Sequence, residues 1–441
     1  MDDGKLLWSI WQRLLSAFSG VFTRPGWVRL VQWVSGTVLC NEEHTITQLL
    51  TSLGQTDEWR NCEHFAEYGA FNTKEVESTL MRLLEQEHPS RFGPYHPVAV
   101  DDTKELRSSG EVWGVCTYKH RSSRNPNHPK LAMGHNWVVM GDLSPGAGKE
   151  PWTYLPTTSR LYFRKGQMPA DEVFATKNEL AVEMLKQADA ASGAPILGIL
   201  DGGYARRSVI RPCLQGATDT GRRIEILTRP RCDARLYEPL EQPAKPNRGR
   251  RRIWGKPLPA PEKYEEWNVP WMHGQAWAYG RMRTFKYKMV ECRWSVSGPG
   301  NPMHMFVFEV EGYNKPWFIV TSALDLSAAQ VLEAYTARFR QEDCIRDHKQ
   351  RMGMEEARAW TKAPVLRTFT VQQLSITLLR LVQWEWEKHH GEGWCPAPAW
   401  NKHKTRVSIL DMRRLLWEHR GEFSQFIREM IELRKIPRPA A

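Results

Sequence analysis

The chain has 441 residues, more than one ordinary domain, and its 41% hydrophobic and 25% charged content is that of a globular protein. It contains no apolar run of about 18 residues, which excludes a membrane-spanning helix. Its eight cysteines form no CxxC pair, which argues against a disulfide framework and favours a reducing compartment.

Positive charge is concentrated in one part of the chain. The net charge is +11 and the pI is near 9.2, which favours a polyanionic partner, most simply nucleic acid. Residues 205–256 hold 14 Lys or Arg against five Asp or Glu. The densest group is Arg248, Arg250, Arg251 and Arg252, which we interpret as phosphate contacts, with a flexible charged loop as the alternative.

The first 90 residues are predicted to be helical. Ile46, Leu49 and Leu50 recur at helical spacing, and Thr73 is a candidate N-cap for a further helix. A helical region of this size could bind DNA ends, although no recognition helix stands out in the sequence.

From about Pro94 the pattern changes to strands and helices in alternation. Residues 98–102 are a short apolar run that ends in Asp101 and Asp102, as in a buried strand with functional residues at its tip. Further strands are expected at 112–118 and 136–140.

A second strand ending in a carboxylate follows. A helix is expected over 171–191, then the apolar strand 195–200 running into Asp201, then a helix through Val209 and Ile210 and a strand at 224–227. Strands that alternate with helices in this way predict a mixed or parallel sheet with helices on its faces.

The region from 229 to 316 differs in composition and is predicted to be a β-rich insertion. It combines a Pro/Arg-rich stretch with clustered tryptophans and ends in strand-like runs at 289–296 and 304–310. The core resumes with a strand at 317–321 and a long helix from Leu326 onward, and residues 363–441 are helical again.

Four polar residues of the long helix share one stripe. Tyr335, Arg338, Glu342 and Lys349 are spaced by three, four and seven positions, which places them on one face of a helix. Such a stripe is usually apolar. This stripe would suit a metal site beside a phosphate backbone. Glu342 would bind the metal, Arg338 and Lys349 the phosphate, and Tyr335 would stack or hydrogen-bond beside them. The alternative is a solvated face with ordinary ion pairs.

Three carboxylates are expected to meet in space: Asp101, Asp201 and Glu342. Acidic residues at the carboxyl ends of neighbouring strands converge, and hard oxygen ligands suit Mg²⁺ or Mn²⁺. Two such ions would serve in-line phosphodiester displacement. Adjacent strand residues face opposite sides, so only one of Asp101 and Asp102 can join the cluster, and we favour Asp101. Taken singly, Asp201 before two glycines could equally be a turn or cap residue.

The order of these residues resembles the DDE transposases of bacterial insertion sequences. It matches the cut-and-paste group with the Tyr-x2-Arg-x3-Glu-x6-Lys signature, here Tyr335, Arg338, Glu342 and Lys349, and the resemblance extends over roughly residues 98–360. It implies an α/β, ribonuclease-H-like mixed sheet flanked by helices and interrupted by a β-rich insertion, with helical N- and C-terminal regions.

The resemblance also implies site roles and partners. Asp101, Asp201 and Glu342 would be the catalytic residues and would bind two Mg²⁺ (or Mn²⁺) ions. Tyr335, Arg338 and Lys349 would contact DNA near the scissile phosphate. The partners would be double-stranded DNA, as transposon ends and target, and a second copy of the chain in a homodimer on DNA. A cytoplasmic, nucleoid-associated protein is expected.

Some relatives stack an aromatic residue of the insertion on a flipped base. Trp294 is one candidate for DNA binding of this kind, although core packing is the commoner role for a tryptophan. The other candidates are Trp254, Trp267, Trp271 and Trp277.

The expected organisation has five parts, in the order helical N-terminal domain, first part of the core, basic β-rich insertion, second part of the core with the catalytic helix, and helical C-terminal region. Their expected ranges are 1–90, 91–228, 229–316, 317–362 and 363–441. The predicted activity is metal-dependent cleavage and strand transfer at terminal inverted repeats. The alternatives are a structure-selective nuclease on the same fold and a catalytically silent DNA-binding protein.

Overall fold

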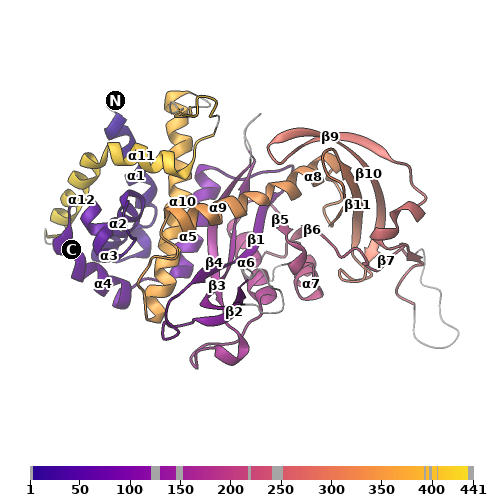
Figure 1. The fold of residues 1–441 in the computed structure, drawn as a ribbon, viewed down its shortest axis with the longest axis horizontal. Helices are drawn as coiled ribbons and strands as arrows, with labels where there is room; N and C mark the ends of the chain where they lie inside the picture. The colour runs from indigo at the N-terminus through magenta and orange to yellow at the C-terminus, as the bar shows by residue number, and fades with distance from the viewer. Residues whose placement is uncertain are drawn as a thin grey trace.

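The computed structural model combines one large sheet with helices on its faces and a helical body at one end (Figure 1). It describes residues 3–120, 130–145, 152–216, 220–240, 252–391, 394–396, 400–404 and 406–435.

The described strands form a mixed sheet in the order β2-β3-β1-β5-β6-β12-β11-β10-β7-β8, and β4 also pairs with β3 and β9 with β10. The pairs β1–β5 and β5–β6 are parallel, whereas the remaining pairs are antiparallel. The strands are β1 (His96–Leu106), β2 (Cys116–His120), β3 (Lys130–Ser144), β4 (Thr153–Tyr162), β5 (Ile196–Leu200), β6 (Glu225–Thr228), β7 (Leu236–Tyr237), β8 (Pro257–Leu258), β9 (Met272–Ala278), β10 (Arg281–Trp294), β11 (Pro302–Val310) and β12 (Trp317–Thr321).

This architecture confirms the predicted fold class, a ribonuclease-H-like mixed sheet flanked by helices. The α-helices are α1 (Asp3–Ser16), α2 (Arg24–Leu39), α3 (Ile46–Ser52), α4 (Trp59–Tyr68), α5 (Thr73–Glu87), α6 (Lys177–Ala191), α7 (Arg207–Gln215), α8 (Ala328–Ala337), α9 (Phe339–Arg351), α10 (Lys362–His390), α11 (Ile409–Glu418) and α12 (Arg420–Lys435). No described helix has the length and apolar character needed to cross a membrane.

The strands of the insertion continue the same sheet. β11 pairs with β12, β10 pairs with β11, and β9 forms a hairpin with β10. These strands carry the sheet beyond β12 to the far end of the molecule from the helical body (Figure 1). The insertion therefore enlarges the core sheet, and α8 packs against β9.

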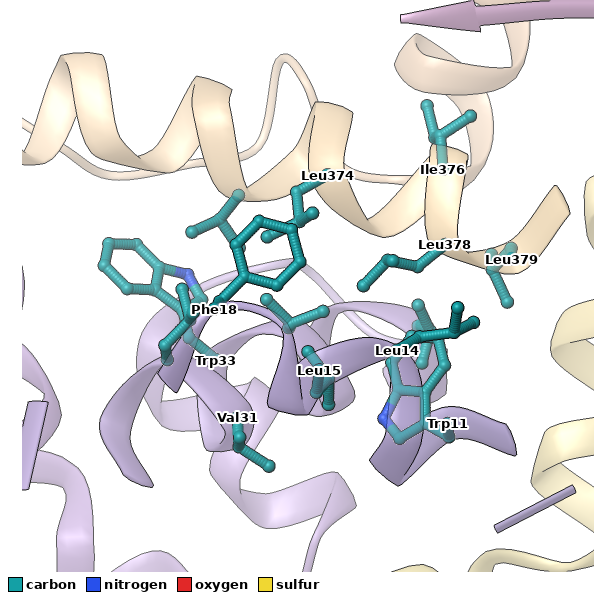
Figure 2. Close-up of a cluster of buried hydrophobic side chains, with 14 of the residues drawn as sticks. Trp11, Leu14, Leu15, Phe18, Val31, Trp33, Leu374, Ile376, Leu378 and Leu379 are labelled. Carbon is teal, nitrogen blue, oxygen red and sulfur yellow. The ribbon is translucent and has the colours of Figure 1, made fainter. Parts of the chain in front are cut away.

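Helices from the two ends of the chain share one hydrophobic core. Trp11 and Leu14 of α1 lie against Leu378 and Leu379 of α10, and all four are at most 1% exposed (Figure 2). Burying this much aliphatic and aromatic surface is the main source of stability for such a body. Residues 7–84 and 352–427 therefore form one unit in space.

Several predicted boundaries were wrong for local reasons. The helix expected from 171 begins at Lys177, because the Thr176 side chain and Glu179 form a capping box there. The long helix expected from Leu326 is two helices, α8 and α9. They meet at Arg338, whose backbone stays in the helical region.

The first carboxylate strand was also longer than expected. β1 extends to Leu106, so Asp101 lies inside the strand and not at its tip. However, the parallel pairing with β5 ends at Val100, opposite Leu200. Beyond that point β1 is paired only with β3, through Leu106.

Candidate active site

The end of the β1–β5 ladder brings Asp101 and Asp201 together. Val100 pairs with Leu200, so each aspartate is the residue that follows the last paired position of two adjacent parallel strands. This is the sheet edge at which ligand sites of α/β proteins form.

Arg338, at the junction of α8 and α9, connects these aspartates to the two helices. Its Nη1 lies 2.9 Å from Asp101 Oδ2, and its Nη2 lies 3.8 Å from Asp201 Oδ1 and 3.5 Å from Glu342 Oε1. One guanidinium thus contacts all three carboxylates singled out in the sequence, although they are about 100 and 140 residues apart along the chain.

Asp102 faces the other way. Its Oδ2 lies 2.7 Å from Lys177 Nζ at the start of α6. Asp101 points towards Arg338, as the alternation of side chains along a strand requires. The two neighbouring aspartates therefore have separate cationic partners on opposite faces of the sheet.

Burial perturbs the charge state of Asp101. Desolvation raises the pKa of this carboxyl group to about 6, against the opposing effects of Arg338 and of the Asp102 backbone N–H, which donates to Oδ1 at 2.8 Å. The charges of Asp102 and Asp201 raise it further. A perturbed carboxyl group beside a cation in a site of this kind is a common mark of function.

Asp201 also has a structural role. Its Oδ2 accepts a hydrogen bond from Gly203 N at 3.1 Å and caps the short 3-10 helix Gly202–Tyr204. The cap fixes the turn and leaves Oδ1 directed at Arg338. The cap and the cluster thus use different oxygens of the same carboxylate.

The signature residues of the two helices lie at different depths. Tyr335 on α8 is partly buried, which raises the pKa of its hydroxyl group. Glu342 on α9 is exposed. Lys349, two turns further, donates to the Lys104 carbonyl oxygen of β1 and forms an ion pair with Glu355 at 2.9 Å. Lys349 therefore ties α9 to the end of β1.

The donor set fits a hard divalent cation in its chemistry, since three carboxylates converge on one positive group. Within the described ranges, no three His, Cys, Asp or Glu side chains lie close enough to share an ion. In this structure the Arg338 guanidinium, with one positive charge, lies among the three carboxylates. Asp101, Asp201 and Glu342 are the residues that would hold a metal.

Two groups near the cluster were not expected from the sequence. Tyr204, 4% exposed, has a hydroxyl with no hydrogen-bond partner in the described structure, and the charges of Asp101, Asp102 and Asp201 act on it. Tyr279, at the tip of the β9–β10 hairpin, has a φ of 48°. Gly280 is a turn signal that could have indicated the hairpin tip, whereas a tyrosine at positive φ could not have been predicted.

Of the insertion's aromatic and basic candidates, Trp294 and Arg252 lie in the part of the chain that the structure describes, and they differ in exposure. Trp294 is 2% exposed in the core of the sheet, so in this structure its ring is not available for stacking. Arg252 is exposed and its guanidinium donates to the Trp254 and Gly255 carbonyl oxygens. Arg248, Arg250 and Arg251 lie outside the described residues.

The mixed sheet flanked by helices, with Asp101 and Asp201 just beyond the end of the β1–β5 ladder, places the protein in the class of ribonuclease-H-like folds. More particularly, the chain belongs to the family described as DDE superfamily endonuclease, whose model matches residues 17–289. This family indicates an endonuclease or transposase type of enzyme that acts on DNA, and its members generally use divalent metal ions. A search of curated proteins found no match.

The matched range includes two of the three candidate acids. Asp101 and Asp201 lie within it, and Glu342 lies beyond its end. Assignment of Glu342 to the site therefore depends on its contact with Arg338 and on the sequence signature.

Proposed function

We propose that the protein is the transposase of an insertion sequence, which cleaves DNA at terminal inverted repeats and joins the freed ends to a target. The proposal places it in the cut-and-paste group with the Tyr-Arg-Glu-Lys signature. The observation that carries it is the contact of one guanidinium with Asp101, Asp201 and Glu342. Family membership supports a DNA substrate.

In the proposed mechanism Asp101, Asp201 and Glu342 would hold Mg²⁺ or Mn²⁺, which would supply charge neutralisation and activation of the attacking oxygen. Arg338 exchanges its carboxylate partners for the phosphate being attacked, since a guanidinium binds phosphate with the same fork of N–H groups. Lys349 and Tyr335 flank this phosphate, and Lys349 keeps α9 in place against β1. A homodimer on DNA would hold two ends together.

The decisive experiment uses the purified full chain, Mg²⁺ or Mn²⁺, and a labelled DNA fragment that carries a terminal repeat. We expect nicking at the repeat boundary, and loss of nicking by at least about 100-fold in Asp201→Asn and Glu342→Gln with DNA binding retained. Asp102→Asn is the matched control, because Asp102 faces Lys177 on the other side of the strand. Cutting by Asp201→Asn at the wild-type rate would refute the assignment.

A nuclease without strand transfer is the second candidate, and the family description, an endonuclease, favours it. Both candidates predict metal-dependent cutting. They differ in whether the cut end is joined to a second DNA molecule, so a supercoiled plasmid target added to the same reaction separates them.

A further inference from the structure

The β9–β10 hairpin turns at a residue that a tight turn does not favour. Ala278 pairs with Arg281, so the loop consists of Tyr279 and Gly280 alone. Their φ angles are 48° and 80°, and a two-residue loop with positive φ at both positions favours Asn followed by Gly. Among the described residues, Tyr279 is the only non-glycine residue with positive φ. This backbone conformation costs a tyrosine free energy, so contacts of its side chain must hold it there.

The side chain of Tyr279 lies in an aromatic cluster. Its ring packs edge-to-face on Phe339, with centroids 5.7 Å apart and 83° between the planes. It packs in the same way on Trp317, at 5.9 Å and 82°, and it lies 5.9 Å from the ring of Tyr313. Edge-to-face pairs of this kind stabilise a structure beyond the area that they bury. The tip of the insertion is therefore joined to α9 by ring contacts.

Phe339 connects this cluster to the acidic site. It is the first residue of α9 and directly follows Arg338, whose guanidinium contacts the three carboxylates. The long helix is interrupted at Arg338, so the direction of the first turn of α9 depends on what packs against it. Tyr279 supplies such a contact from the hairpin, and α8, on the other side of the junction, packs against β9 of the same hairpin.

The electrostatics of Tyr279 agree with this placement. Burial raises the pKa of its hydroxyl group, and the neighbouring Tyr313 raises it further. The charge of Arg338 lowers this pKa and that of Glu342 raises it. Burial also raises the pKa of Tyr335, and Tyr279 adds to this effect. The side chain of Tyr279 therefore lies within electrostatic range of the signature residues.

We propose that Tyr279 is a positioning residue, whose ring holds Phe339 so that the first turn of α9 keeps Arg338 directed at the carboxylates. The turn alone does not need a ring, so this role accounts for a tyrosine at a position suited to asparagine. In this role Tyr279 contacts neither DNA nor a metal ion. The inference rests on the proposed function, because that proposal gives Arg338 its part in cleavage.

The first test measures local order in the full chain, without DNA or divalent ions. Tyr279→Asn removes the ring and suits the turn, so the free energy of unfolding in urea should stay close to that of the wild type. Amide hydrogen exchange at residues 338–342 should nevertheless accelerate at least about 5-fold, as expected for the loss of two edge-to-face ring pairs. Tyr279→Phe keeps the ring and should exchange like the wild type.

The second test uses the labelled terminal-repeat fragment with Mg²⁺ under single-turnover conditions. Tyr279→Asn should nick at least about 10-fold more slowly, because a small misplacement of a group at the reacting phosphate slows the chemical step. The Kd for the fragment should change little, since the ring does not contact DNA. Tyr279→Phe should retain most of the rate, which shows that the ring and not the hydroxyl group is required.

Met282→Thr is the matched control in the same hairpin. The Met282 side chain is exposed and points to the opposite face of β10 from Arg283, whose guanidinium lies 5.0 Å from the centroid of the Tyr313 ring. This variant should exchange and nick like the wild type. An equal effect in this control, or an equal loss in Tyr279→Phe, would overturn the proposal.

The two tests separate this inference from the proposed function. If the wild type does not nick the fragment, the transposase is refuted, whereas faster exchange in Tyr279→Asn still supports the positioning of α9 by Tyr279. Nicking by the wild type together with unchanged exchange in Tyr279→Asn would overturn the positioning role and keep the transposase. Nicking by Tyr279→Asn at the wild-type rate would overturn the positioning role as well.

Discussion

At the scale of single residues, Arg338 is the centre of the site. Sequence spacing predicted that Arg338 and Glu342 share a helical face, and they do lie 3.5 Å apart. Spacing could not reveal that the same guanidinium also reaches Asp101 and Asp201, since that depends on how α8 and α9 pack against the sheet.

Replacing Arg338 should therefore expose the repulsion among the carboxylates. We expect Arg338→Ala to lower the free energy of unfolding at pH 7.5 by about 1.5–3 kcal/mol, the range for hydrogen bonds to charged groups. Added Mg²⁺ should raise the free energy of unfolding of the variant by more than that of the wild type, because the variant has no guanidinium among its carboxylates. Urea denaturation with and without Mg²⁺ measures both effects. Arg340→Ala, which breaks the neighbouring pair with Asp343, should show no such recovery; equal responses to Mg²⁺ would contradict the role of Arg338.

At the scale of elements, the strands with simple patterns were predictable and those with interruptions were not. β12 was predicted with its observed bounds, since it is a short apolar run. β4 was missed because Pro156 argues against a strand, and the structure places an irregularity in the β3–β4 pairing beside it. The predicted strand ended at Asp102, whereas β1 continues to Leu106. Its second half is polar, so no apolar run marked it as strand.

The packing of α9 against α10 makes a prediction about pH. His348, 4% exposed, lies 3.2 Å from Gln372 Oε1, and burial lowers the pKa of its imidazole to about 4. The unfolded state, with a pKa near 6.5, binds the proton more readily. Above pH 6.5 the buried neutral ring therefore does not lower the free energy of unfolding. As the pH falls from 6.5 towards 4, the unfolded state gains the proton first and the free energy of unfolding decreases.

Between pH 7 and pH 5 this effect of His348 lowers the free energy of unfolding by about 2 kcal/mol at most. His348→Gln should thus show a smaller fall in the free energy of unfolding over that interval, as measured by urea denaturation at both pH values. Identical pH profiles for the variant and the wild type would show that His348 is not buried as a neutral ring.

At the scale of the whole molecule, the basic excess and the shared helical core make separate predictions. Combined replacement of Arg250, Arg251 and Arg252 by Ala should weaken binding to a DNA end and flatten its salt dependence, by about 0.9 in slope for each phosphate that is no longer neutralised. Electrophoretic mobility shifts over a salt series measure this. Unchanged binding at every salt concentration would remove the assignment of this stretch to DNA.

The helical core predicts coupled loss of order at both ends of the chain. Trp11 is fully buried among the apolar side chains of this core (Figure 2). Its Nε1 donates a hydrogen bond to Ser35 Oγ at 2.9 Å. Trp11→Ala should cost about 3–5 kcal/mol. Hydrogen exchange should accelerate in α1, α2 and α10 together, while β1 and β5 keep their protection. Acceleration limited to α1 would show that the two ends do not form one cooperative unit.

The same shared core sets an order of events during synthesis. Helices α10, α11 and α12, which cover part of the apolar surface of α1 and α2, leave the ribosome more than 300 residues after these two helices. Contacts of such long sequence separation form late, and an emerging chain with uncovered apolar helices is prone to aggregate. A nascent chain interrupted just after β12 would contain every strand of the described sheet and no finished helical body. Chaperone demand should therefore be greatest before residue 352 has been translated.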